Sequence, residues 1–204
     1  KIYKIYIKME INSKFNNSIS YKIHLLKDVK KKENLKKLIS NSFISLLSPK
    51  LIIGFNHITI AIEKAITSKF RRTNRSLSKD VIYYSLDNSK LDYCLEKHNL
   101  FKNEDKSNDN QNEVICCFIV IINIKNNVQT DNKLELNEAE ALMSLNEDEL
   151  KVKFDCSVLG IEDYSYYTDF NEIKNEFQIS DDEINTDSGI IGAVYNRISL
   201  KDIK

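Results

Sequence analysis

The feature that most constrains the fold is an apolar run, VICCFIVIINI, at Val114–Ile124. A membrane-spanning helix needs roughly 18–20 consecutive apolar residues, so this run is too short to cross a bilayer. A strand that is apolar on both faces has to be covered on both faces. We therefore predict a central β-strand over 114–124 with other elements packed on each side of it. Polar stretches flank the run, and we expect loops near 102–113 and 126–133.

The spacing of apolar residues elsewhere predicts both strands and helices. Alternation with polar residues, or a short β-branched and aromatic run, predicts strands over 19–25, 81–84 and 150–158. Spacings of three and four residues, with a Ser-x-x-Asp capping box at Ser89–Asp92 for one helix, predict helices over 35–42, 58–66, 89–98, 138–145, 170–177 and 190–198. These elements do not follow a strict βαβ order. We predict an α+β fold, a single domain over 1–204 with a small mixed or antiparallel sheet packed by several helices.

The charges are strongly segregated along a chain whose net charge is zero. Residues 1–75 hold 17 Lys and Arg against 4 Asp and Glu, whereas residues 126–187 hold 4 against 17. A basic first third can face the phosphates of a nucleic acid, which an acidic segment repels. The alternative is that both segments are solvated faces that attract each other within one fold.

Residue types that carry catalysis or bind metals do not form a recognisable pattern. The cysteines include no C-x-x-C pair, the histidines no H-E-x-x-H motif, and the few glycines neither a P-loop nor a dinucleotide-binding loop. We expect no enzyme activity, no catalytic residue, no metal and no cofactor. Free thiols, and a start (KIYKIYIKMEI) unlike a signal peptide, favour a cytoplasmic or nuclear protein without a membrane association. Met9 is a possible initiator.

Two apolar helix faces and one basic segment are the candidates for binding partners. The helix over 58–66 is apolar on more than one side, which suits either the core or a partner, and the last helix has one apolar stripe. The predicted partner-binding residues are Ile58, Ile62, Ile66, Ile190, Ile191, Val194, Tyr195 and Ile198. Between the helix over 58–66 and the next element, cations cluster around an aromatic side chain that can stack on an unpaired base. The predicted RNA-binding residues are Lys64, Lys69, Phe70, Arg71, Arg72, Arg75 and Lys79.

Four segments together resemble one known family. They are HLLKDVKKKENLKK (24–37), SLLSPKLIIGFNHITIAIEKAI (45–66), RTNRSLSKDVIYYSL (72–86) and GAVYNRISLKDIK (192–204). In the second segment, the positions that match the family's core motif are Pro49, Ile52, Ile58, Ala61, Lys64 and Ala65. In order and spacing, the chain is similar to the smallest subunit of the KEOPS (EKC) complex, the TPRKB or PRPK-binding protein family.

The resemblance implies a non-catalytic subunit of the complex that places N6-threonylcarbamoyl on the adenosine next to the anticodon of tRNA. Such a subunit binds the kinase-like ATPase subunit, helps hold the 3′ CCA end of tRNA, and meets the threonylcarbamoyl-transferase subunit only indirectly. The leading alternative is a stand-alone RNA-binding protein that uses the basic first third. A weaker one is a small transferase, which requires a cleft with a perturbed histidine or carboxylate.

Overall fold

The computed structural model describes residues 7–9, 18–69, 75–102, 115–125 and 133–201. Its contacts group into two compact units, which we describe separately. The sheet unit comprises residues 1–46 and 109–161, and the helical unit comprises residues 47–108 and 162–204. Most of the two predicted polar loops lies outside the described residues. The predicted single domain over 1–204 stays a prediction, whereas the α+β class is confirmed.

The described strands form one five-stranded sheet in which β2 is paired on both edges. The order is β1-β2-β4-β3, with β5 also paired to β2, and the pairs β1–β2, β2–β4 and β2–β5 are antiparallel. The strands are β1 (Ile7–Met9), β2 (Ser18–Val29), β3 (Ile44–Leu47), β4 (Ile115–Lys125) and β5 (Ser157–Leu159).

Strand β4 is the central strand that the apolar run predicted. Successive residues from Cys117 to Ile122 are all buried, so both faces of the strand are covered. The predicted strand over 19–25 is also confirmed and continues to Val29 as β2. Before its end, the pairing with β4 shifts between Leu26 and Val29, where Asp28 has a φ of 58°. This positive φ at a bulge increases the local bend of β2.

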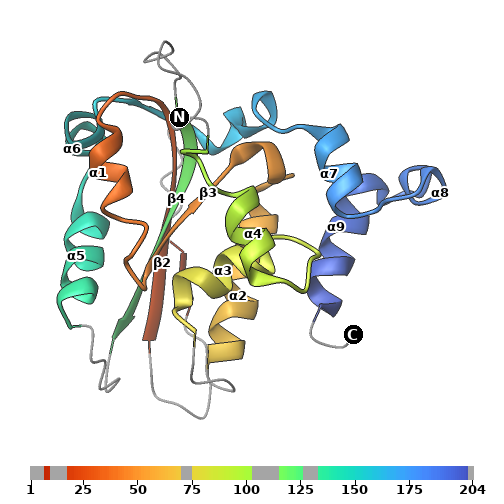
Figure 1. Cartoon of the computed structure of the whole chain (residues 1–204), viewed down its shortest axis with the longest axis horizontal. Coiled ribbons are helices and arrows are strands. Elements are labelled where there is room, and N and C mark those ends of the chain that lie inside the picture. The colour runs from red at the N-terminus through yellow and green to blue at the C-terminus, as the bar shows by residue number, and fades with distance from the viewer. Residues whose placement is uncertain (1–6, 10–17, 70–74, 103–114, 126–132, 202–204) are drawn as a thin grey trace. The chain divides into compact units, whose positions relative to one another are not determined.

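Helices α1 (Lys32–Lys36), α5 (Lys133–Ser144) and α6 (Glu147–Phe154) complete the sheet unit, and α5 runs beside β2 and β4 in Figure 1. A buried lysine of β2 fixes the end of α5. The Nζ of Lys22 donates to the carbonyl oxygens of Met143, at 3.1 Å, and Leu145, at 2.7 Å. A cation at this end also opposes the negative end of the helix dipole.

The predicted strand over 150–158 is wrong over most of its length, because a capping box starts a helix there. Asn146 accepts from the backbone N–H of Glu149, whose carboxylate accepts from the N–H of Asn146. Helix α6 ends at Phe154, and Asp155 follows it in the left-handed conformation, with a φ of 46°. Only Ser157–Leu159 is a strand. Val152, which the alternation placed in the core, is 72 % exposed.

The helical unit is built around α2 (Phe55–Lys69), which packs against α3 (Leu77–Tyr84) and α9 (Gly189–Leu200). The other elements are the 3-10 helices η1 (Pro49–Leu51) and η2 (Ile161–Tyr166) and the helices α4 (Leu91–Lys97), α7 (Phe170–Glu176) and α8 (Asp181–Ile184). The helices predicted over 58–66, 170–177 and 190–198 are confirmed.

Two predictions in this unit need correction. The residues 81–84, predicted as a strand, form the second half of α3, because the Ser76 side chain accepts from the N–H of Lys79 and starts a helix upstream. Helix α4 exists, but its N-cap is Lys90, so the Ser89 box does not form. In the sheet unit, the helix predicted over 35–42 ends early, at Lys36, and Ile39 is 56 % exposed.

Candidate partner-binding surfaces

The apolar stripe of α2 lies inside the chain. Ile58, Ile62 and Ile66 are all buried, and α3 and α9 pack against the same helix. Of the two interpretations that the sequence left open for this helix, the structure favours core packing. These three isoleucines present no surface to a partner, which corrects their assignment as partner-binding residues. The elements that cover α2 could not be predicted, because one of them is α3, part of which was predicted as a strand.

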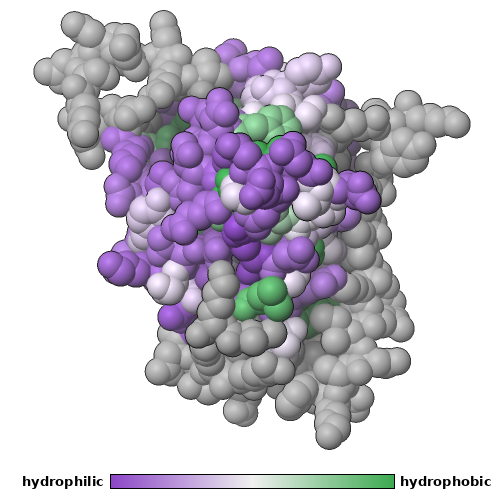
Figure 2. Space-filling model, turned by 90° about the vertical axis from the view of Figure 1, so that its right-hand side faces the viewer, coloured by the Kyte–Doolittle hydropathy of each residue, from purple (hydrophilic) through white to green (hydrophobic). Residues whose placement is uncertain are grey.

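Helix α9 divides its predicted stripe between core and surface. Val194 and Ile198 are buried, whereas Ile190 and Tyr195 are half-buried and Ile191 is 46 % exposed. Residues 191 and 195 are one turn apart and share a side of the helix. The accessible part of the predicted interface is therefore Ile190, Ile191 and Tyr195. Figure 2 shows the face on which α8 and α9 lie, where hydrophilic residues surround small hydrophobic areas.

Two tyrosines extend this surface toward the start of α2. A Cβ atom on Gly54 would lie 3.2 Å from the hydroxyl of Tyr195 and 3.3 Å from that of Tyr164, so both rings approach the backbone there. Burial, and then the neighbouring Tyr164, raise the pKa of Tyr195. The Tyr166 side chain on η2 is 84 % exposed. The residues YSYY at 164–167 are rich in tyrosine, but nothing in the sequence shows that Tyr164 approaches Gly54 and Tyr195.

An ion pair holds α8 against α9. The guanidinium of Arg197 on α9 donates to both carboxylate oxygens of Glu183, at 2.8 and 2.9 Å, and to the carbonyl oxygen of Gln178, at 3.1 Å. The hydrogen bonds from Arg197, and from the backbone of Ser180, lower the pKa of Glu183 to about 2. A bidentate pair of this kind fixes direction as well as distance. The short α8 is therefore oriented on α9.

The basic segment is described only in part. Phe70, Arg71 and Arg72 lie outside the described residues, and so does the side chain of Lys69, the last residue of α2. Lys64 is half-buried on α2, and Lys79 is exposed on α3. The guanidinium carbon of Arg75 lies 4.9 Å from the centre of the Tyr83 ring, a cation–π contact. Lys64 lies on α2, Lys79 lies on α3, and Arg75 precedes α3 by two residues, and α2 and α3 pack together.

Two histidines form a buried network in the helical unit. The Nδ1 of His57 accepts from the N–H of Ile53, at 3.2 Å, and the Nδ1 of His98 accepts from the N–H of Ser48, at 3.0 Å. Each Nε2 therefore carries the proton and lies 2.8 Å from Ser85, from its carbonyl oxygen for His57 and from its Oγ for His98. Burial lowers the pKa of His57 to about 4 and that of His98 to about 3.

This network joins parts of the helical unit that are far apart in the sequence. All four ring nitrogens are engaged inside the unit, so neither ring is left to exchange a proton with a substrate. The sequence showed only that the histidines form no metal-binding motif, and it did not indicate that residues 57, 85 and 98 meet. Their only shared signal is that each is a polar residue next to an apolar helix stripe.

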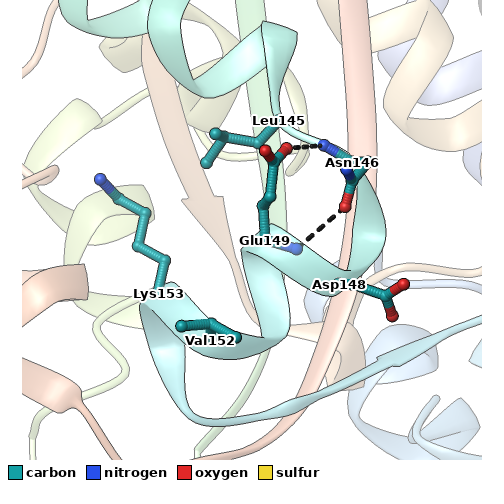
Figure 3. Close-up of a pocket in the computed structure, with 6 residues that line it drawn as sticks. All are labelled: Leu145, Asn146, Asp148, Glu149, Val152 and Lys153. Carbon is teal, nitrogen blue, oxygen red and sulfur yellow. Dashed lines mark hydrogen bonds between the residues drawn. The ribbon is translucent and has the colours of Figure 1, made fainter.

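Other site chemistry is limited in the part of the chain that the structure describes. There, no group of three or more His, Cys, Asp or Glu side chains could hold a metal ion, and no helix is long and apolar enough to span a membrane. Figure 3 shows an open depression on α6, lined by Leu145, Asn146, Asp148, Glu149, Val152 and Lys153. Two of these residues, Asn146 and Glu149, are bonded to each other in the capping box, and the carboxylate of Asp148 pairs with Lys151 at 3.0 Å.

Comparison with known proteins bears on the interpretation of these surfaces. A search of curated proteins finds no match to the chain. The family model described as kinase binding protein CGI-121 matches residues 26–202, which include two of the segments that carried the sequence resemblance in full and most of the other two. The match spans residues of both units. The chain therefore belongs to the kinase binding protein CGI-121 family, and the resemblance to the KEOPS subunit family is confirmed.

Proposed function

We propose that this chain is a non-catalytic subunit of a KEOPS-type complex, which binds the kinase-like ATPase subunit and helps hold the 3′ CCA end of tRNA for threonylcarbamoyl transfer. Membership of a kinase-binding family over 26–202 is the observation that carries the proposal. The engaged histidine rings and the surface groove on α6 agree with a chain that works by binding. The transfer itself then belongs to another subunit.

The surface that we assign to the kinase-like subunit consists of Ile190, Ile191 and Tyr195 on α9, with Tyr164 beside them. Aromatic and aliphatic side chains that are half-exposed around a helix are suitable anchors for a partner. Such a subunit would act in the cytoplasm or the nucleus.

Replacing Ile191 with Asp is expected to weaken binding of the kinase-like subunit at least about tenfold, since a charge would enter an apolar contact. Co-purification and titration calorimetry with the kinase-like subunit from the same source would measure this loss. Val194 is unsuitable for the same experiment because it is buried, and its replacement would unfold the unit.

Val152→Asp is the matched control, because it also places a carboxylate at an exposed apolar position but lies on α6 of the sheet unit. It should bind like the wild type. Circular dichroism has to show that both variants remain folded. Equal binding by Ile191→Asp and the wild type would refute the α9 surface, and no binding by the wild type would refute the kinase-binding role itself.

The tRNA contact is assigned to Lys64, Arg75 and Lys79, together with residues 69–72 of the same segment. Reversing the charge of Arg75 and Lys79 to Glu should weaken tRNA binding and reduce the dependence of log K on log salt by about one to two units. Filter binding at several salt concentrations would test this, with Lys151→Glu and Lys153→Glu on α6 as the control pair. Unchanged binding would remove the segment from the proposed RNA site. Tight tRNA binding by a wild type that ignores the kinase-like subunit would favour the stand-alone RNA-binding alternative.

A further inference from the structure

The glycine before α2 sets how closely two tyrosine rings approach the backbone. Gly54 is buried, and a Cβ atom there would lie 3.2 Å from the hydroxyl of Tyr195 and 3.3 Å from that of Tyr164. Both distances are shorter than ordinary van der Waals contact, whereas the Cζ atom of Tyr164, at 3.7 Å, would be in ordinary contact. A side chain at position 54 would therefore crowd the two hydroxyls.

The backbone at Gly54 does not itself require a glycine. Gly189 has a φ of 53°, in the region that favours glycine, but the φ of Gly54 is not positive. The carbonyl oxygen of Gly54 accepts from the N–H of His57 at 3.1 Å, a hydrogen bond that any residue can form. The feature that excludes a side chain at position 54 is thus the pair of tyrosine hydroxyls.

The segment that carries Tyr164 is held against the stretch before α2. The Oγ1 of Thr168 donates to the carbonyl oxygen of Ile52 at 2.8 Å, and the N–H of Asp169 donates to the carbonyl oxygen of Lys50 at 3.0 Å. These hydrogen bonds resist a movement of the whole segment. Crowding at position 54 would therefore turn the Tyr164 ring.

The helix that carries Tyr195 is fixed as well. Val194 and Ile198 are buried, and α9 packs against α2. A closely packed interior resists the shift of a helix, so crowding would turn the Tyr195 ring. Because Tyr195 shares a side of α9 with the exposed Ile191, a turned ring changes the surface beside that isoleucine.

We propose that Gly54 is a positioning residue for kinase binding: it allows Tyr164 and Tyr195 to meet beside the start of α2, and the kinase-like subunit binds the surface in that form. The inference rests on the proposed function and adds a residue that acts through the two tyrosines. A surface that already has its bound shape avoids the cost of ordering side chains on association. Without that order, the complex should dissociate faster.

The test is titration calorimetry of the full chain with the purified kinase-like subunit from the same source. Gly54→Ala should bind about two- to threefold more weakly and Gly54→Val about tenfold, since the crowding grows with the side chain. Thermal unfolding should find Gly54→Ala close to the wild type, because the backbone there accepts an L-residue. Gly160→Val makes the same replacement at an exposed glycine of the sheet unit and should bind like the wild type.

Removal of the two hydroxyls distinguishes positioning from a general defect at position 54. Tyr164→Phe with Tyr195→Phe keeps both rings and should bind like the wild type. Combined with Gly54→Ala, the same pair removes the crowded oxygen atoms and should restore the wild-type affinity.

The inference is overturned if the folded Gly54→Val variant binds like the wild type, if the phenylalanines do not restore Gly54→Ala, or if Gly160→Val weakens binding as much. Weak binding by the phenylalanine pair alone would also overturn it, because the hydroxyls would then contact the partner directly. Absence of binding by the wild type would instead overturn the proposed function and this inference with it.

Discussion

Lowering the pH from about 6.5 to about 5 is expected to reduce the free energy of unfolding by about 3–4 kcal/mol per pH unit. Burial lowers the pKa of His24 and His57 to about 4 and that of His98 to about 3, against an ordinary value of 6.5. Between these values, each histidine takes up a proton only when the chain unfolds. The contribution of the neutral histidines to the free energy of unfolding is therefore fully present above about pH 6.5. It is lost as the pH falls toward the pKa values of the folded state.

The geometry of the two helical-unit histidines gives the reason. Protonation of His57 or His98 would place a proton on Nδ1, which accepts from the backbone of Ile53 or Ser48, and both hydrogen bonds would be lost. Urea unfolding at several pH values between about 5 and about 7 would measure the slope, a window above the range in which carboxylates titrate.

His98→Asn is the informative variant, since an asparagine oxygen can replace Nδ1 as an acceptor without titrating. Whatever it does to the stability at neutral pH, it should reduce the slope against pH by about one third. A wild-type slope near zero, or an unchanged slope in the variant, would contradict the assignment of neutral buried histidines.

Replacing Lys22 with Met is expected to lower the free energy of unfolding by about 2–4 kcal/mol at neutral pH. The Met side chain leaves the carbonyl oxygens of Met143 and Leu145 without their buried donor, and the end of α5 loses its cation. Removal of the Lys22 charge also removes the free-energy cost of burying that charge. This gain offsets part of the loss and keeps the net change within that range. Urea unfolding at neutral pH would measure the difference.

A second measurement distinguishes the loss of this contact from a general packing defect. Burial first, and then the charge of Lys22, lower the pKa of His24, so that this pKa should rise in Lys22→Met and can be followed by NMR. Lys153→Met, at an exposed lysine of α6, is the control and should change neither quantity by much. A stability equal to that of the wild type would show that Lys22 does not hold α5.

Elements with strong and unambiguous periodicity could be predicted from the sequence. The run that became β4 and the stripes of α2 and α9 each match the periodicity of one type of secondary structure. The two strands that were predicted wrongly, at 81–84 and 150–158, have a common cause. In each, a side chain upstream of the apolar pattern, Ser76 or Asn146, caps a helix that the pattern itself did not indicate.

The candidate surfaces could be predicted only as sets of residues. The sequence identified the stripe of α9, but exposure separates Ile191 from Val194, and exposure depends on which elements cover the helix. Likewise, the acidic stretch was visible in the sequence, whereas the Arg197–Glu183 pair that orients α8 joins residues in different helices. Contacts of this kind follow from tertiary packing and have no local signal.

Each of the two units is assembled from separate parts of the chain, residues 1–46 with 109–161 and residues 47–108 with 162–204. During synthesis, the segment that carries His57, Ser85 and His98 is therefore made well before α7 and α9, which complete its unit. Contacts between such distant segments close long loops and slow folding. The early helices have to wait with apolar surface uncovered, so we expect this protein to depend on chaperones until residues 162–204 have been added.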